Sequence, residues 1–294
     1  MEKLLQWSIA NSQGDKEAMA RAGQPDPKLL QQLFGGGGPD DPTLMKESMA
    51  VIMNPEVDLE TKLVAFDNFE MLIENLDNAN NIENLKLWEP LLDVLVQTKD
   101  EELRAAALSI IGTAVQNNLD SQNNFMKYDN GLRSLIEIAS DKTKPLDVRT
   151  KAFYALSNLI RNHKDISEKF FKLNGLDCIA PVLSDNTAKP KLKMRAIALL
   201  TAYLSSVKID ENIISVLRKD GVIESTIECL SDESNLNIID RVLSFLSHLI
   251  SSGIKFNEQE LHKLNEGYKH IEPLKDRLNE DDYLAVKYVL WLRP

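Results

Sequence analysis

The side chains that most often perform chemistry are few and widely scattered in this sequence. No cysteine lies close enough to a histidine or to another cysteine to form the short-spaced ligand pairs of a zinc site. Two of the histidines are eight residues apart and could share one helix face, which leaves open both a metal site and ordinary solvated histidines. We favour solvated histidines and expect no metal. The residues concerned are His163, His248, His262, His270, Cys178 and Cys229.

A run of four glycines, Gly35 to Gly38, is the other feature that could bind a ligand. It continues as Pro-Asp-Asp-Pro-Thr and lacks the Gly-Lys-Ser/Thr ending of a phosphate-binding loop. Carboxylates are plentiful, but sequence alone cannot pair two of them into an acid–base couple. We therefore expect a protein that is not an enzyme and that needs no cofactor.

Composition narrows the choice of partner. The 294 residues include 34 basic and 45 acidic side chains, giving a net charge of −11. Such a charge argues against nucleic acid and against an anionic membrane surface as the main partner. The longest uncharged stretch, residues 105–119, is too short to span a bilayer. The N-terminus does not resemble a secretory signal, and both cysteines lie in apolar helical patterns, so we predict a cytosolic protein.

A repeat of about 45 residues organises the chain. Four glycines, Gly131, Gly175, Gly221 and Gly267, recur at spacings of 44, 46 and 46 residues, three of them in Asn-Gly or Asp-Gly steps. Glycine accepts the left-handed conformation that follows the last helical residue. We predict that each of these glycines ends a helix.

Arginines mark a second ladder with the same period. Arg104, Arg149, Arg195 and Arg241 are spaced by 45, 46 and 46 residues, and Lys62 holds the equivalent place in an earlier copy. Such an arginine can be structural, satisfying carbonyls of the neighbouring helix, or it can contact a partner. Both readings stay open for the ladder. Arg195 has the stronger claim to a partner, because it closes a local cluster of four bases within residues 189–195.

Each repeat is expected to contain three helices. In one copy, apolar residues recur with helical period over 147–161, and two shorter helices follow at about 165–173 and 176–184. Repeats begin near residues 58, 102, 147 and 191, with a degenerate fifth near 236. The period and the three-helix unit resemble armadillo repeats, so the fold class is all-α, an armadillo superhelix of about four repeats plus caps.

The ends of the chain differ from the repeats. We predict a mobile N-terminal arm at 1–38, an N-terminal cap helix at 39–57, repeats over 58–280 and a C-terminal cap helix at 281–294. The glycine run makes the arm flexible. Its apolar residues are Leu4, Leu5, Trp7, Leu33 and Phe34.

The armadillo resemblance implies a concave face lined by the long helices. On the best copy, Tyr154 and Asn158 lie one turn apart on the outward side. Nuclear-import adaptors carry a Trp-x-x-x-Asn pair there in many repeats, and this chain has no tryptophan at that place, which argues against that class. The equivalent pairs by offset from the arginine ladder are Asp67 and Met71, Ser109 and Thr113, Leu200 and Leu204, and Leu246 and Ile250.

The end of the first long helix offers another candidate contact. Ala79 and Asn80 lie in the run Asp77 to Asn81, which we predict to be a polar loop. A small alanine among turn-forming residues would let another backbone approach closely. An ordinary solvated loop is the alternative reading.

Taken together, the chain resembles the armadillo-type nucleotide-exchange factors of cytosolic 70-kDa heat-shock chaperones, in their fungal form. The resemblance is carried by the opening residues 4–11, by the segment 34–39 with its four glycines, by residues 44–47 and by the repeat count. It covers essentially the whole chain. No single one of these motifs is diagnostic, but their order is specific.

The resemblance implies a function. The concave face would bind the ATPase domain of the chaperone and promote ADP release, and the arm would act on the chaperone's substrate-binding domain. The alternative for the arm is docking on its own armadillo body, and the alternative for the whole protein is a passive scaffold for an extended peptide. We expect a monomer. The partner-binding candidates are Lys62, Asp67, Ala79, Asn80, Arg104, Arg149, Tyr154, Asn158 and Arg195.

Overall fold

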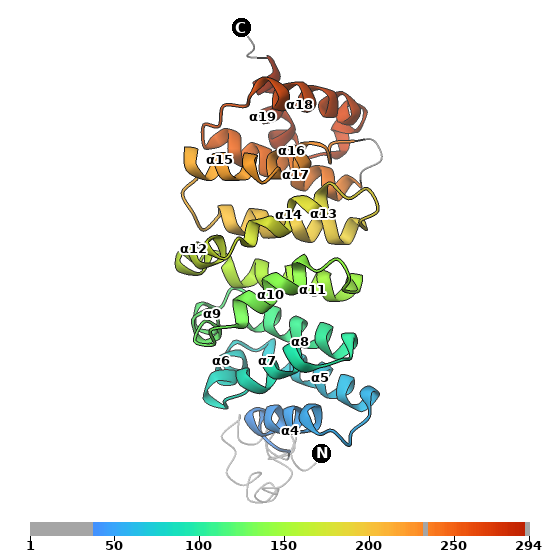
Figure 1. The fold of residues 1–294 in the computed structure, drawn as a ribbon, viewed down its shortest axis with the longest axis vertical. Helices are drawn as coiled ribbons and strands as arrows, with labels where there is room; N and C mark the ends of the chain where they lie inside the picture. Colours follow the sequence, from blue (N-terminus) through green and yellow to red (C-terminus); the bar gives the residue numbers. More distant parts are fainter. Residues whose placement is uncertain (1–37, 232–234, 292–294) are drawn as a thin grey trace, which may run out of the picture. The chain divides into compact units, whose positions relative to one another are not determined.

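The computed structural model describes residues 38–231 and 235–291. The chain divides into two compact units, Met1–Glu47 and Ser48–Pro294. The described residues contain helices and no strand (Figure 1), which confirms the all-α prediction. None of their helices is both long and apolar enough to cross a membrane.

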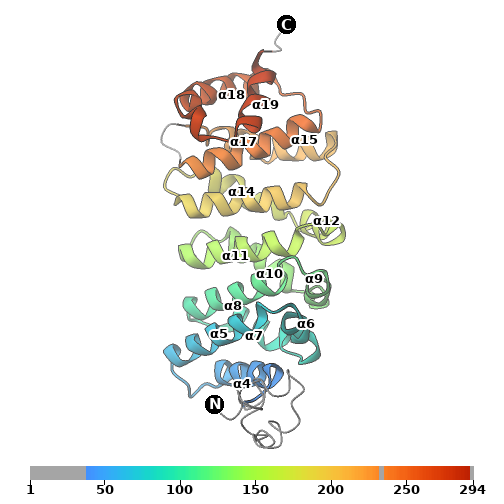
Figure 2. The same cartoon turned by 180° about the vertical axis from the view of Figure 1, so that it is seen from behind.

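Five long helices form one layer of the second unit. Each packs against the next (Figure 2), and each begins within one residue of a predicted repeat start. They are α5 (Leu59–Ile73), α8 (Glu101–Ala114), α11 (Leu146–Ile160), α14 (Pro190–Leu204) and α17 (Leu236–Ser251).

A second helix follows every long one, and it has seven to nine residues in the first four repeats and 14 in the last. An Asn, His or Asp side chain accepts a hydrogen bond from the first turn of each, satisfying a backbone N–H group that the helix itself leaves free. These capping side chains belong to Asn75, Asn118, His163, Asp210 and Asn257. The helices are α6 (Leu76–Asn84), α9 (Leu119–Phe125), α12 (Lys164–Lys172), α15 (Glu211–Lys219) and α18 (Glu258–Ile271).

The third helix of a repeat lies behind the long layer. In the copy with the clearest pattern, the predicted helix at 176–184 is split into a 3-10 turn, η1 (Gly175–Cys178), and α13 (Ala180–Leu183). Pro181 lies in the first turn of α13, the part of a helix in which a proline breaks no backbone hydrogen bond. The corresponding helices are α7 (Trp88–Gln97), α10 (Gly131–Ser140) and α16 (Val222–Ile227).

Helices lie at the two ends of the described chain, in the segments predicted as caps to within one residue. α4 covers Asp41–Met53 and buries Met45, Met49 and Ile52. The 3-10 helix η2 (Glu272–Arg277) leads into α19 (Glu280–Trp291), which packs on α17. By packing on α17, α19 covers apolar surface that the last repeat would otherwise expose.

The glycine ladder has a different cause from the one predicted. Only Gly221, with φ of 70°, has the left-handed backbone, and Gly267 lies inside α18. At the other rungs the reason is packing. A Cβ atom at Gly131 would lie 2.8 Å from the ring of Phe125, and one at Gly175 would lie 2.2 Å from the ring of Phe170.

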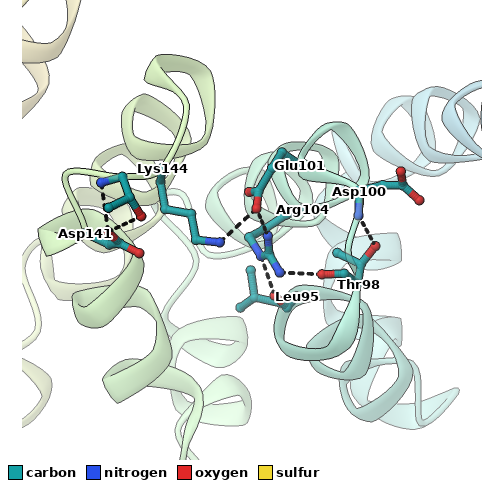
Figure 3. A network of polar contacts seen from close by, with 8 residues as sticks. Leu95, Thr98, Asp100, Glu101, Arg104, Asp141 and Lys144 are labelled. Carbon is teal, nitrogen blue, oxygen red and sulfur yellow. Dashed lines mark hydrogen bonds and ion pairs between the residues drawn. The ribbon is translucent and has the colours of Figure 1, made fainter.

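A polar network joins two successive repeats at the start of the long helices (Figure 3). Arg104 is buried, and its Nε donates to the carbonyl of Leu95 at 3.0 Å. Glu101 accepts from Arg104 and, at 2.8 Å, from Lys144 of the next repeat. Burial raises the pKa of Glu101, but these two cationic donors outweigh it and leave that pKa below its ordinary value.

This network makes stability depend on pH. A carboxyl group with a lowered pKa in the folded state stabilises the fold above its unfolded pKa, and that contribution is lost as pH falls through the folded value. We expect Glu101→Gln to lower the free energy of unfolding by about 1 kcal/mol at pH 7. The difference should close below about pH 4, measured by urea denaturation.

The matched control is Glu102→Gln, which removes an exposed carboxylate from the same first turn. It should change stability by less than about 0.5 kcal/mol. Equal losses in both variants would show that the network contributes nothing of its own.

Candidate partner-binding face

The outward side of the five long helices is built from equivalent residues of successive repeats. Counted from the first residue of each helix, positions two, six and nine are about one turn apart and lie on one side. In α8 these positions hold Glu102, Ala106 and Ser109. We call this side of α5, α8, α11, α14 and α17 the long-helix face (Figure 2).

Hydrogen bonds cross this face from the first repeat to the third. Glu70 of α5 accepts from Ser109 at 2.7 Å and from Thr113 at 2.8 Å, both on α8. Lys151 of α11 donates to the Ser109 hydroxyl at 2.8 Å. A single carboxylate and a single ammonium group therefore fix the spacing of three helices.

Tyr154 lies at the centre of the face. Its hydroxyl donates to Gln116 Oε1 at 3.1 Å, and its ring supports the guanidinium carbon of Arg195 at 4.8 Å from the ring centroid. The ring can lie flat because position 112 is glycine: a Cβ there would be 2.4 Å from Tyr154 Cδ1. A cation held over an aromatic ring loses side-chain freedom before any partner arrives.

Asn158 does not face outward. It is 8% exposed, and its Nδ2 donates to the carbonyl of Gly112 at 3.1 Å. The prediction that Asn158 lies on the outward side, one turn from Tyr154, is therefore wrong. The amide instead joins α11 to α8, while Gln122 donates to the Asn158 carbonyl at 2.9 Å.

The arginine ladder is in fact two ladders. Arg104 and Arg149 are the fourth residues of their helices, and each Nε donates to a carbonyl at the end of the preceding third helix, Leu95 at 3.0 Å and Ala139 at 3.2 Å. In α14 the fourth residue is Lys193, which donates to the Leu183 carbonyl at 2.9 Å. For Arg104 and Arg149 the structural alternative therefore holds.

Arg195 belongs to the other ladder. It is the sixth residue of α14, as Lys151 is of α11 and Arg241 is of α17. Arg149 and Arg195 are 46 residues apart, whereas α11 and α14 begin 44 residues apart, so the register based on Arg195 is displaced by two residues. Arg195 lies on the long-helix face, as predicted for a partner contact.

The same displacement corrects the predicted equivalents of Tyr154 in the last two repeats. Leu200, Leu204 and Leu246 are buried core residues. The ninth residues of α14 and α17 are Ala198, which is half-buried, and Ser244, which is exposed.

The first repeat presents a different surface. Asp67 is exposed at the ninth position of α5, between Val64 and Met71, whose side chains are 53% and 64% exposed. Lys62, the fourth residue of α5, is half-buried. Apolar side chains thus reach solvent on the α5 part of the long-helix face.

The predicted polar loop at Asp77–Asn81 is a helix. These residues lie within α6, which Asn75 caps. Ala79 is buried, at 3% exposure, and Asn80 accepts from Ser121 of α9 at 3.1 Å. The prediction of a loop was wrong because the capping asparagine and the apolar Ile82 favour a helix over a run of turn-forming residues.

The five apolar arm residues, Leu4, Leu5, Trp7, Leu33 and Phe34, lie outside the described residues. Sequence reasoning missed Glu70, Lys151 and Lys193. A signal for the first two was available, because they fall on the same helix side as Asp67 and Tyr154.

The described residues offer little that could act as a reactive group. No group of three metal-ligating side chains gathers among residues 38–231 and 235–291. Burial raises the pKa of Cys178 to about 12, which keeps this thiol protonated at neutral pH.

Comparison with known proteins agrees with this architecture. A family model described as nucleotide exchange factor Fes1 matches residues 1–82, and one described as the SIL1/FES1/HPBP1 C-terminal domain matches residues 78–215. A protein of Candida glabrata named Hsp70 nucleotide exchange factor FES1 is 68% identical, over 98% of this chain and 99% of its own. This chain belongs to the Fes1 family.

Further similarities extend the Fes1 assignment. A protein of Kluyveromyces lactis with the same name is 62% identical over 98% of this chain and 99% of its own. Among solved structures, a designed armadillo repeat protein in complex with the peptide (KR)4 matches 86% of this chain and all of its own, with a TM-score of 0.65 and 15% identity. That likeness confirms the armadillo fold of the Fes1-family chain.

The burial of Asn158 gives a test of the face's internal support. Asn158→Ala removes the hydrogen bond to Gly112 and leaves that carbonyl unsatisfied, so we expect a loss of about 1–3 kcal/mol in the free energy of unfolding. Urea denaturation followed by circular dichroism measures it. The control is Gln116→Ala, an exposed partner of Tyr154, with an expected loss below about 0.5 kcal/mol. A stable Asn158→Ala variant would contradict the supporting role.

Proposed function

We propose that this protein is a nucleotide-exchange factor for a 70-kDa heat-shock chaperone in the cytosol and that it acts as a monomer and not as an enzyme. The single observation that carries the proposal is the match along the whole chain to relatives named Hsp70 nucleotide exchange factor FES1. The long-helix face gives those relatives' named activity a physical basis in this chain.

The mechanism is a coupling between two binding events. A rigid face that binds one lobe of the ATPase domain, in the arrangement where the nucleotide cleft is open, lowers the affinity for ADP. Linkage requires ADP to weaken the binding of the exchange factor by the same factor. A hundredfold coupling corresponds to about 2.7 kcal/mol.

The face residues divide into contacts and supports. In this proposal Arg195, Tyr154 and Asp67 contact the chaperone directly. Arg104 and Arg149 hold the long helices against the third helices. Lys62 and Asn80 are the candidate contacts at the first repeat, whereas Ala79 belongs to the core.

The other candidate function is a passive scaffold for an extended peptide. The observation that favours it is the structure of the designed armadillo repeat protein, which is in complex with a peptide. Against it, Asn158 is buried in an inter-helix hydrogen bond and is not available to grip a peptide backbone.

Stopped-flow release of a fluorescent ADP analogue from a purified chaperone ATPase domain tests the proposal. Strong, saturable acceleration by this protein is the expected result. Binding without acceleration would overturn the exchange-factor reading and leave the scaffold.

Arg195 can be tested alone. Arg195→Ala should weaken binding of the ATPase domain by about tenfold without destabilising the array, since loss of a charged contact costs about 1–3 kcal/mol. Isothermal titration calorimetry measures the affinity. The control is Arg133→Ala, which removes an exposed arginine from α10, on the other layer. Unchanged affinity in Arg195→Ala would exclude this residue from the interface.

The N-terminal arm calls for a separate assay. Deleting residues 1–34 should leave ADP release intact and slow the release of a fluorescent peptide from the full-length chaperone. Substituting only Leu4, Leu5 and Trp7 by serine in the full-length protein should give the same result. Normal peptide release by both variants would contradict a role for the arm in substrate release.

A further inference from the structure

The long-helix face changes its charge from one end to the other. Positions two, six and nine of each helix lie about one turn apart on one side. At these positions every charged residue of α5 and α8 is a carboxylate, and every charged residue of α14 and α17 is cationic. The residues in order are Glu60, Val64 and Asp67; Glu102, Ala106 and Ser109; Asp147, Lys151 and Tyr154; Lys191, Arg195 and Ala198; and Asn237, Arg241 and Ser244.

Contacts on the face confirm that these positions lie together. Lys151, a sixth residue, donates to Ser109, a ninth residue of the previous helix, at 2.8 Å. Arg195, also a sixth residue, lies over Tyr154, also a ninth residue. The same register therefore runs from α8 through α14.

The charged groups at both ends are accessible. Glu60 and Asp67 on α5 are exposed, and so are Lys191 on α14 and Arg241 on α17. Between them, α11 carries one carboxylate, Asp147, and one ammonium group, so the sign changes near the middle of the face.

The two ends act independently on a partner. Packed helices lie about 8–10 Å apart, so α5 and α14, three steps apart, are separated by roughly 25–30 Å. Salt screens charges beyond about 8 Å at physiological ionic strength. A partner therefore meets a local acidic field and a local basic field, and the net charge of −11 does not average them out.

The acidic end is also the more apolar end. Val64 and Met71 on α5 are more than half exposed, whereas the neutral face residues of α14 are alanines. Electrostatic attraction at the basic end steers the encounter, and apolar burial at the α5 end contributes to the lifetime of the complex.

We propose that this charge gradient selects one orientation of a folded partner. In that orientation, an anionic patch of the partner lies on α14 and α17, and a patch of the partner that is cationic and partly apolar lies on α5. The inference rests on the proposed function, with the chaperone ATPase domain as the partner. A domain turned end for end would place like charges opposite each other at both ends. An extended basic peptide would be repelled at α14.

The experiment exchanges the charges without altering the net charge. Glu60→Lys, Asp67→Lys, Lys191→Glu and Arg195→Glu are combined in one variant. The matched control exchanges the same number of exposed charges on the other helices: Glu89→Lys, Glu137→Lys, Lys172→Glu and Lys219→Glu, on α7, α10, α12 and α15. Circular dichroism and thermal unfolding verify that both variants fold.

Association with the ATPase domain is followed by stopped flow at about 50 mM and about 300 mM salt. In the exchanged variant we expect the association rate constant to fall about tenfold at the lower salt and the difference to shrink at the higher salt. The control should stay within about twofold of the unmodified protein. Equal rates for the exchanged variant and the control would overturn the proposal.

Two further measurements separate orientation from the importance of Arg195. The variant with only Glu60→Lys and Asp67→Lys leaves Arg195 in place and should also slow association. A zero-length carbodiimide cross-linker, which joins amines to carboxylates, should link Lys191 to acidic residues of one patch on the ATPase domain. It should link Glu60 or Asp67 to lysines of a second patch.

Cross-links from Lys191 scattered over both patches would overturn a single orientation. If the unmodified protein neither binds the ATPase domain nor accelerates ADP release, the proposed function fails. If it does both and the exchanged variant matches the control, only the orientation proposal fails.

Discussion

The close approach of α8 and α11 is the constraint on which the long-helix face depends. Position 112 must lack a side chain, because a Cβ there would lie 2.4 Å from the ring of Tyr154 and 3.2 Å from the backbone of Ala155. That approach brings the Asn158 amide within reach of the Gly112 carbonyl and sets the Tyr154 ring beneath Arg195. The arrangement of side chains in the middle of the array thus depends on the absence of a side chain at one position.

Sequence periodicity predicted the fold well because the same pattern of apolar residues recurs in every repeat. Apolar residues at helical spacing determine which side of a long helix is buried, and all five long helices begin within one residue of the predicted starts. The exact register was harder. Arg149 and Arg195 look equivalent by their spacing of 46 residues, but α11 and α14 begin only 44 residues apart. Arg195 therefore lies on the open face, and Lys193 has the carbonyl-binding role.

Side-chain roles were less predictable for a physical reason. Asn158 and Ala79 are compatible with exposed or buried positions, and only the distance to a neighbouring repeat decides between them. At Gly131 and Gly175 a neighbouring phenylalanine ring leaves no room for a side chain, which explains glycine there. Of the four ladder glycines, only Gly221 has the left-handed backbone. Helix boundaries and contacts between repeats depend on tertiary packing, and they cannot be predicted from a single sequence.

The hydrogen bonds that join the long helices all connect nearby parts of the chain. Ser109 to Glu70, Tyr154 with Thr113 and Asn158 to Gly112 span 39, 41 and 46 residues. Once two successive repeats have emerged from the ribosome, both partners of each hydrogen bond between them are present. The array can fold from its first repeat onward during synthesis, without waiting for its C-terminus.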